Sequence, residues 1–244
     1  MLLGFGFLGA FINAIVGGGG LITVPALLAV GLPPAMAIGT NKLAAAVGNL
    51  TSLLTFMRAG KVDWRLLLPV LPWVFAGSVA GAISVHQLSP QILQPLIIAL
   101  LVVVLLYTLF KKNIGQPQQA VLLTERRRRI GYALLVGIGF HDGFFGPGAG
   151  SFMILVMLFM GMDFVCAAGS SKLLNLTSNT AALLTFMWLG SVNYAYGLIM
   201  AAAMVAGAYA GSRLALSRGT GFVRVLFISV TSVLILKNLY DLLG

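Results

Sequence analysis

Two lysines, Lys42 and Lys172, stand inside apolar stretches, and asparagines follow each of them along the chain. A lysine at the centre of a membrane costs about 2.5–3.5 kcal/mol on insertion scales, so it is a candidate for function. Lys172, Asn175 and Asn179 have the spacing of one helix face, as do Lys42 and Asn49. Ammonium and amide donors on one face suit an anionic ligand. The alternative is that both lysines lie near a helix start and extend to the membrane surface.

Glycine-rich breaks interrupt the chain at two corresponding places, 17–20 and 146–150. Glycine permits a backbone that ends a helix, and the next helix then presents free N–H groups and the positive end of its dipole. Such a helix start suits an anion. The alternative is close packing of helices through small residues.

Hydroxyl and amide side chains next to the lysines complete the predicted site. Thr40, Asn41, Ser170 and Ser171 can donate to a ligand or cap a helix that begins after the preceding glycine. The residues that we expect to bind substrate are Gly18, Gly19, Gly20, Asn41, Lys42, Asn49, Gly148, Gly150, Ser170, Ser171, Lys172, Asn175 and Asn179.

A histidine and an aspartate, His141 and Asp142, precede the second glycine break, where a gapless alignment of the two halves gives Phe11 and Ile12. Such a pair at membrane depth can relay protons or offset the charge of a buried lysine. We therefore take His141 and Asp142 as candidates for coupling. The alternative is a polar pair that faces water or marks a helix boundary. Asn13, which precedes the first break, is a candidate for lining the same cavity.

The composition predicts that these residues belong to an all-α polytopic membrane protein. The chain has 244 residues, of which 59% are hydrophobic and 8% are charged, whereas a soluble domain has about 25% charged residues. The runs 66–85, 91–110 and 221–236 are nearly free of charge, and about 20 apolar residues cross a bilayer as a helix. A β-barrel would need alternating apolar and polar residues, which these runs lack.

The chain also repeats itself. The motif at 37–43 returns at 167–173, and the sequence at 53–57 returns unchanged at 183–187. We predict a first transmembrane repeat at 1–110, a basic linker at 111–129 and a second repeat at 130–244, each a glycine-broken helical hairpin plus three transmembrane helices. The expected segments are 1–16, 20–31, 35–57, 66–85 and 91–110, and then 130–145, 149–161, 164–188, 192–212 and 221–240.

The basic residues predict the orientation. If the linker is cytoplasmic, the positive-inside rule also places the loops at 57–66 and 213–224 inside, whereas the loops at 86–90 and 188–192 carry no Lys or Arg. Corresponding loops then face opposite sides, so the second repeat is inverted and both termini lie outside. If each short pair crossed once as a single broken helix, the arginines at 213–224 would lie outside instead.

Several other classes of function lack their residues. The single cysteine, Cys166, excludes an intrachain disulfide and a cysteine metal site, and we expect no metal or cofactor. A Walker lysine motif, a His-Glu-x-x-His motif and a nucleophile elbow are all missing from the sequence, so we expect no enzyme. The net charge of +10 lies in the loops, so it does not indicate nucleic acid binding.

The glycine motifs resemble those of the sulfite exporter TauE/SafE family over the whole chain. The second run is similar to the second glycine run of that family, although it contains Pro147 and Ala149 and no Val-Pro pair follows it. The resemblance implies export of small sulfur oxyanions or organosulfonates, such as sulfite or sulfoacetate, across the bacterial inner membrane. The matching first run is Gly17-Gly18-Gly19-Gly20-Leu21-Ile22-x-Val24-Pro25, followed by Pro33-Pro34 and by Ala37-x-Gly39-Thr40-Asn41-Lys42.

We therefore expect a secondary transporter that exports a small anion by alternating access, with its site between the two repeats. Its partners would be a sulfur oxyanion and the lipid bilayer, with protons as the coupling ion and no nucleic acid. One alternative is an anion channel on the same scaffold, which gradient-coupled, saturable flux would distinguish. Another is an intramembrane enzyme or lipid-handling protein that uses His141 and Asp142, which would show turnover without vectorial flux.

Overall fold

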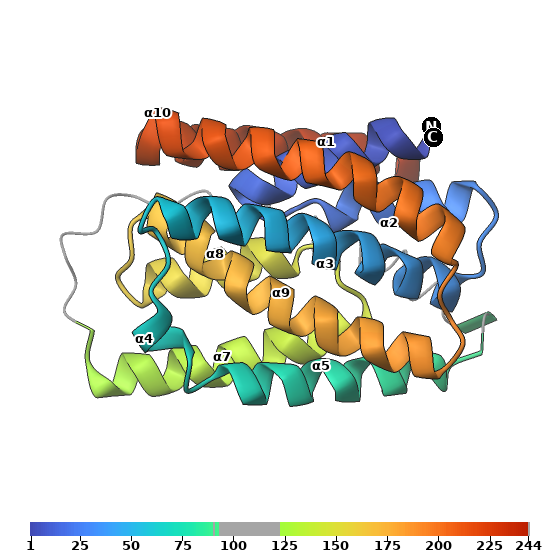
Figure 1. Ribbon diagram of the computed structural model, residues 1–244, viewed down its shortest axis with the longest axis horizontal. Coiled ribbons are helices and arrows are strands. Elements are labelled where there is room, and N and C mark those ends of the chain that lie inside the picture. Colours follow the sequence, from blue (N-terminus) through green and yellow to red (C-terminus); the bar gives the residue numbers. More distant parts are fainter. Residues whose placement is uncertain (90, 93–122, 244) are drawn as a thin grey trace.

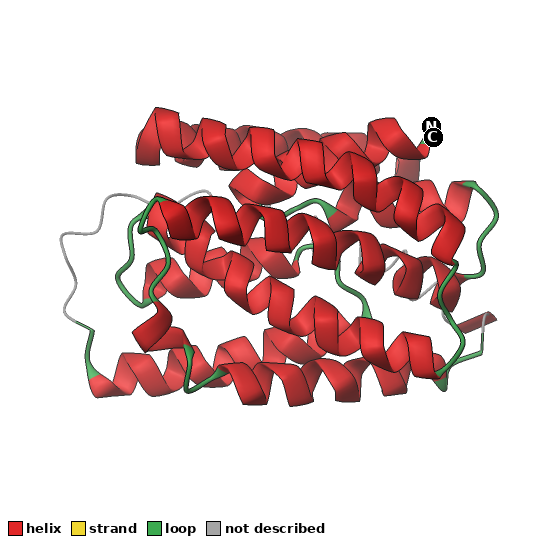
Figure 2. Cartoon of the chain, viewed as in Figure 1, coloured by secondary structure: helices red, strands yellow, loops and turns green. Residues whose placement is uncertain are grey.

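A computed structural model describes residues 1–89, 91–92 and 123–243, and its regular structure in this part of the chain is helical (Figure 2). Most of the predicted apolar segment at 91–110 and most of the linker predicted at 111–129 lie outside the described residues. The helices are α1 (Leu2–Val16), α2 (Gly20–Ala29), α3 (Pro34–Arg58), α4 (Trp64–Leu67), α5 (Leu71–His86), α7 (Glu125–Phe144), α8 (Ala149–Phe159), α9 (Phe164–Trp188) and α10 (Tyr194–Leu243).

The helix boundaries differ from the prediction at three places, and at the first of them the segment predicted at 66–85 is divided between α4 and α5. The arginines at 126–129, which we assigned to the linker, form the first turns of α7. This helix begins early because the Thr124 side chain accepts a hydrogen bond from the backbone N–H of Arg127, and Glu125 carries a favourable negative charge in the first turn. The loop predicted at 213–224 is also helical, apart from a kink at Gly219, where φ is 73° and ψ is −171°.

Two helical hairpins enter the molecule from opposite ends (Figure 1). Helix α1 runs from the end that holds the N-terminus to the middle, and α2 returns to that end. Helix α7 starts at the other end, and α8 returns to it after the break in the middle. The 25-residue helices α3 and α9 run the length of the molecule between the hairpins and contact each other.

The remaining contacts are reciprocal. Helix α1 packs against α10, and α7 packs against α5. Gly207 and Gly211 of α10 allow the first approach, because a Cβ atom at either position would collide with a backbone carbonyl of α1. Gly77 and Gly81 of α5 allow the second, against carbonyls of α7. These small residues bring the backbones together as in membrane helix pairs.

Large apolar side chains cover much of the outer surface, whereas several lysine, asparagine and aspartate side chains are buried. Among the described residues, one helical segment, Tyr194–Gly219, is long and apolar enough to span a membrane, and α1, α2, α5 and α8 are shorter apolar helices. Helices α3 and α9, at about 1.5 Å per residue, are long enough to span but carry the buried polar residues. This distribution suits a protein with apolar surroundings.

The two ends of the molecule differ in charge. The N-terminus and the loop that joins α9 to α10 lie at one end (Figure 1). The end of α3, helix α4, the start of α7 and the kink of α10 lie at the opposite end. The basic residues of these segments are Arg58, Lys61, Arg65, Arg126, Arg127, Arg128, Arg129, Arg213 and Arg218.

Candidate functional site

The two glycine breaks touch each other at the centre of the molecule. Helix α1 ends at Gly17, where φ is 81°, and Gly148 with φ of 84° precedes α8. A Cβ atom on Gly150 would lie 2.6 Å from the carbonyl oxygen of Gly17, and one on Gly17 would collide with the backbone of Gly150. Only glycine fits this backbone contact, so the end of α1 and the start of α8 meet here.

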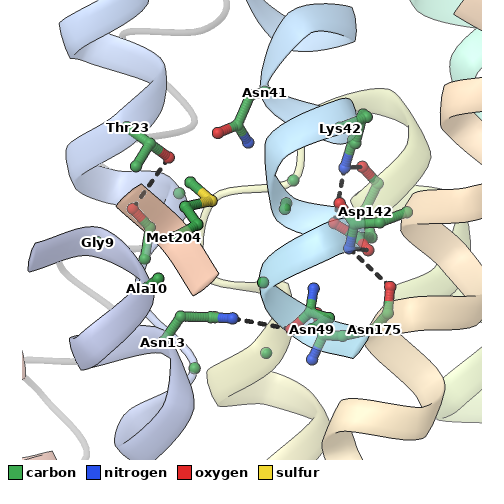
Figure 3. Close-up of a pocket in the computed structure, with 18 residues that line it drawn as sticks. Gly9, Ala10, Asn13, Thr23, Asn41, Lys42, Asn49, Asp142, Asn175 and Met204 are labelled. Carbon is green, nitrogen blue, oxygen red and sulfur yellow. Dashed lines mark hydrogen bonds and ion pairs between the residues drawn. The ribbon is translucent and has the colours of Figure 1, made fainter. Parts of the chain in front are cut away.

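A small cavity of about 30 Å³ lies beside this contact (Figure 3). Because one water needs about 10–15 Å³ on this measure, the cavity has room for about two waters. The predicted site residues that line it are Gly19, Gly20, Asn41, Lys42, Asn49, Gly150, Asn175 and Asn179. Asn13 and Asp142, which were predicted for the cavity and for coupling, line it too. The lining therefore combines residues from both halves of the chain.

Lys42 forms a buried ion pair with Asp142 in the cavity wall. Its Nζ lies 2.8 Å from Asp142 Oδ1 and also donates to the Asp142 backbone carbonyl. The other carboxylate oxygen accepts a hydrogen bond of 3.0 Å from Asn179 Nδ2 and one from Ser178 Oγ. Lys42 is 1% exposed, so its ammonium group points into the interior rather than to the membrane surface. Every oxygen of the Asp142 side chain is occupied.

Lys172 is equally buried but has a different partner. Its Nζ donates to the backbone carbonyl of Asn13, and it forms no ion pair with any other described residue. The side chain of Asn13 in turn donates to Asn49 Oδ1 at 2.9 Å. Lys172 thus lies behind Asn13 and outside the cavity lining.

These contacts show that Asn13 and Asp142 occupy equivalent places. Each lies four residues before a glycine of positive φ, its carbonyl accepts from a buried lysine, and its side chain bonds an asparagine of a long helix. The gapless alignment of the sequence, which matched Asp142 with Ile12, is therefore wrong here by one residue. The shift is absorbed because α8 has 11 residues and α2 has 10. The half-sites around Lys42 and Lys172 therefore differ in one group: the first has the carboxylate of Asp142, and the second has the amide of Asn13.

Comparison with known proteins identifies the chain. The family model described as sulfite exporter TauE/SafE matches residues 2–238. The chain belongs to the TauE/SafE family. It is 38% identical to a probable membrane transporter protein of Haemophilus influenzae, with 97% of this chain and 92% of that protein covered. It is also 38% identical to the probable membrane transporter protein YfcA of Escherichia coli strain K12, with 96% and 87% covered.

A more distant relative is the probable membrane transporter protein YunE of Bacillus subtilis, which is 25% identical, with 88% of this chain and 86% of that protein covered. No solved structure matches the chain. These relatives are all named as probable membrane transporters. A membrane location follows for this TauE/SafE protein.

Three hydroxyl groups near the lysines of this TauE/SafE protein have structural partners. Thr40 Oγ1 accepts from the backbone N–H of Asn193 at 2.9 Å, and Ser170 Oγ accepts from that of Asp63 at 3.1 Å. Ser171 Oγ donates to the carbonyl of Ala168. Thr40 and Ser170 therefore tie the long helices to neighbouring loops. Of the predicted residues, those outside the cavity lining are Gly18, His141, Gly148, Ser170, Ser171 and Lys172.

The two residues of the predicted coupling pair, His141 and Asp142, have different surroundings. Asp142 reaches the cavity, whereas the ring of His141 packs edge-on against Phe145 and Phe152, at centroid distances of 5.9 and 5.8 Å. Neither nitrogen of His141 meets a hydrogen-bond partner in the described part of the chain. The buried side-chain oxygen of Asn41 is also unpartnered among these residues, and Asn41 faces the cavity (Figure 3).

Sequence reasoning missed Ser178, which donates to Asp142 and lies between the predicted Asn175 and Asn179. A signal for it exists, since it stands three residues after Asn175 and so near the same helix face. Thr23, Gly9 and Met204 also line the cavity and carried no such signal, because they are placed there by tertiary packing.

Proposed function

We propose that this TauE/SafE protein is a secondary transporter that exports a small anion, sulfite or an organosulfonate, by alternating access. One observation carries the proposal: a buried polar cavity with a lysine in its wall lies where two glycine breaks meet. The family name supports sulfite as the substrate class. The substrate site lies between the two halves of the chain, as in transporters built from inverted repeats.

The cavity offers the groups that an anion needs in place of water. Lys42 supplies positive charge, and the amides of Asn41, Asn49 and Asn175 supply hydrogen bonds. Backbone N–H groups at the starts of α2 and α8 add the positive ends of two helix dipoles. Lys172 adds a second positive charge behind Asn13. Such groups must replace the hydration shell, because an unpaired buried anion is very costly.

Alternating access follows from the arrangement of the hairpins. We propose that the two halves are inverted repeats and that each hairpin opens the cavity toward its own end of the molecule. The reciprocal packing of α1 on α10 and of α7 on α5 supports this relation. The cavity of about 30 Å³ is too small for a hydrated anion, so another, wider conformation would have to admit the substrate.

We place the basic end in the cytoplasm of a bacterial cell and both termini outside, following the positive-inside rule. The carboxylate of Asp142 and the ring of His141 are the candidates for proton coupling. Asp142 supports this role better, because it lines the cavity and holds the lysine that would receive the anion.

Uptake of labelled sulfite and isethionate into proteoliposomes tests the proposal. Replacing Lys42 or Lys172 by alanine removes a charged hydrogen-bond donor worth about 1.5–3 kcal/mol, so transport should fall about 10- to 100-fold. Lys61→Ala is the matched control, because Lys61 lies in the loop between α3 and α4. If a variant lacking both buried lysines transported at the rate of the unmodified protein, the site would be wrong. Saturable counterflow would exclude the channel alternative.

A further inference from the structure

Three side chains that ionise in water are buried around the cavity in the described residues: Lys42, Lys172 and Asp142. His141 counts as neutral, because its ring packs between Phe145 and Phe152 and a charged imidazole there would lack a partner. With both lysines protonated and Asp142 ionised, the site carries one positive charge in excess.

The excess arises from the single difference between the two half-sites. Asp142 neutralises Lys42 with a carboxylate at 2.8 Å. Asn13, at the equivalent place, offers Lys172 only a backbone carbonyl, because its side chain is an amide that bonds Asn49. Lys42 therefore has a carboxylate of the protein as its counter-ion, and Lys172 does not.

The energy of buried charge then favours a ligand of one particular valence. An uncompensated charge inside a membrane protein costs several kcal/mol, so a loaded site near neutrality is the most stable one. A ligand with one negative charge brings the site to neutrality. A ligand with two negative charges leaves one in excess, and it also competes with the Asp142 carboxylate for Lys42.

We infer that this site selects monovalent anions, and that Asp142 sets the selection by acting as an internal counter-ion for one of the two buried lysines. The inference rests on the proposed function and names the charge class of its substrate. Bisulfite and organosulfonates with a single ionised group fit the class. Sulfate, and sulfonates that carry a second ionised carboxylate such as sulfoacetate, do not.

Transport of isethionate, a monoanion, and of sulfate, a dianion at neutral pH, measures the selection in proteoliposomes at one fixed pH. We expect the unmodified protein to prefer isethionate by about tenfold or more, the effect of roughly 1.4 kcal/mol. Asp142→Asn should lower this ratio at least about tenfold, because the site then has two positive charges. Glu125→Gln is the matched control, since it removes one negative charge from an exposed side chain paired with Arg128; its ratio should stay unchanged.

Two further variants keep the test sharp if Asp142→Asn fails to fold. Asn13→Asp alone gives Lys172 a carboxylate and a neutral empty site, so transport of both anions should fall. Combining Asn13→Asp with Asp142→Asn moves the carboxylate to the other half-site and restores the net charge. This double variant should recover the preference for isethionate. Thermal unfolding in detergent checks that each variant is folded.

The inference is overturned if the unmodified protein transports sulfate as well as isethionate, or if folded Asp142→Asn retains the original ratio. In both cases the proposed function survives, because an anion is still transported through the lysine-dependent site. If the unmodified protein transports neither anion nor sulfite, the proposed function fails together with the inference.

Discussion

At the scale of single residues, the ion pair between Lys42 and Asp142 is the strongest electrostatic feature of the interior. Removing a charge from water is costly unless an opposite charge compensates it. These two buried charges compensate each other and therefore stay together. The hydrogen bonds from Ser178 and Asn179 fix the carboxylate. The pair therefore stabilises the fold only while both partners are present.

Removing one partner should destabilise the protein strongly. Lys42→Met leaves Asp142 buried without its cation, and we expect a loss of about 3–5 kcal/mol in the free energy of unfolding. Lys42→Met combined with Asp142→Leu should recover most of that loss, although not transport. Denaturant unfolding in detergent measures both, and the exposed pair Glu125–Arg128 is the control, worth about 0–1 kcal/mol. Equal losses in the single and double variants would contradict this explanation.

Much of the candidate site could be predicted from residue type and spacing. Lys42, Asn49, Asn175 and Asn179 stood out because helical periodicity places polar residues of an apolar helix on one face. The equivalence of Asn13 and Asp142 could not be seen, because a one-residue difference between α2 and α8 shifts the alignment inside a short apolar hairpin.

At the scale of helices, the contact between the two glycine breaks determines where α2 and α8 begin. We expect Gly150→Ala to force the turn of the first hairpin away, because its Cβ would lie 2.6 Å from the Gly17 carbonyl oxygen. Overpacking of this kind costs about 1–3 kcal/mol.

Transport and thermal unfolding of Gly150→Ala should both decrease. Gly137→Ala is the control: it lies in α7, no neighbour comes within 4 Å of its Cβ position, and alanine favours the helix by about 0.5–1 kcal/mol. Unchanged unfolding in Gly150→Ala would show that the two breaks do not press together.

The N-cap of α9 predicts a pH dependence outside the membrane. Burial alone would raise the pKa of Asp163. Hydrogen bonds from the backbone of Cys166 and Val165, together with the charge of Lys61, lower this pKa by more than burial raises it, so the pKa is lowered overall. A lowered carboxyl pKa adds stability above its unfolded value of about 3.9 and loses it as the pH falls through the folded value.

Asp163→Ala should therefore cost about 1 kcal/mol at neutral pH, as loss of a cap does. The difference from the unmodified protein should shrink below about pH 4. Thermal unfolding at a series of pH values measures this, and Asp163→Asn, which can still cap, should lose less. A difference that grows toward acidic pH would refute the assignment.

The helical segments were largely predictable, because long apolar runs and glycine breaks are local signals. Two boundaries in the second half of the chain were not. The start of α7 at Glu125 depends on a capping threonine within a basic run, and α10 continues through 213–218 because this stretch contains no glycine or proline. In both places the helix contains hydrophilic residues, and composition alone assigns such residues to loops.

At the scale of the whole molecule, the charge difference between the two ends predicts the orientation in the membrane. Ser217 lies in α10 before the kink, at the basic end, and Ser89 follows α5 at the opposite end. Both are exposed. In a Cys166→Ser background, Ser217→Cys should react with an impermeant maleimide only from the cytoplasmic side, and Ser89→Cys only from outside.

Labelling of intact cells and of inverted vesicles measures these accessibilities. The opposite pattern would invert the proposed orientation, and labelling of both cysteines from one side would contradict the arrangement of the two ends. The proposed inverted relation between the halves is a prediction from repeated motifs and loop charges. The meeting of the two hairpins at one cavity could not be predicted in this way, because it depends on contacts between residues far apart in the chain.

The most direct test of the central claim is to locate a bound anion. A cryo-electron microscopy or crystallographic structure with selenite, an electron-rich analogue of sulfite, would show where the anion sits. We predict density in the cavity between the two glycine breaks, within hydrogen-bonding distance of Lys42 Nζ. An anion ordered instead in the open cavity at the basic end beside Arg65, with the central cavity unoccupied at concentrations that saturate transport, would contradict it.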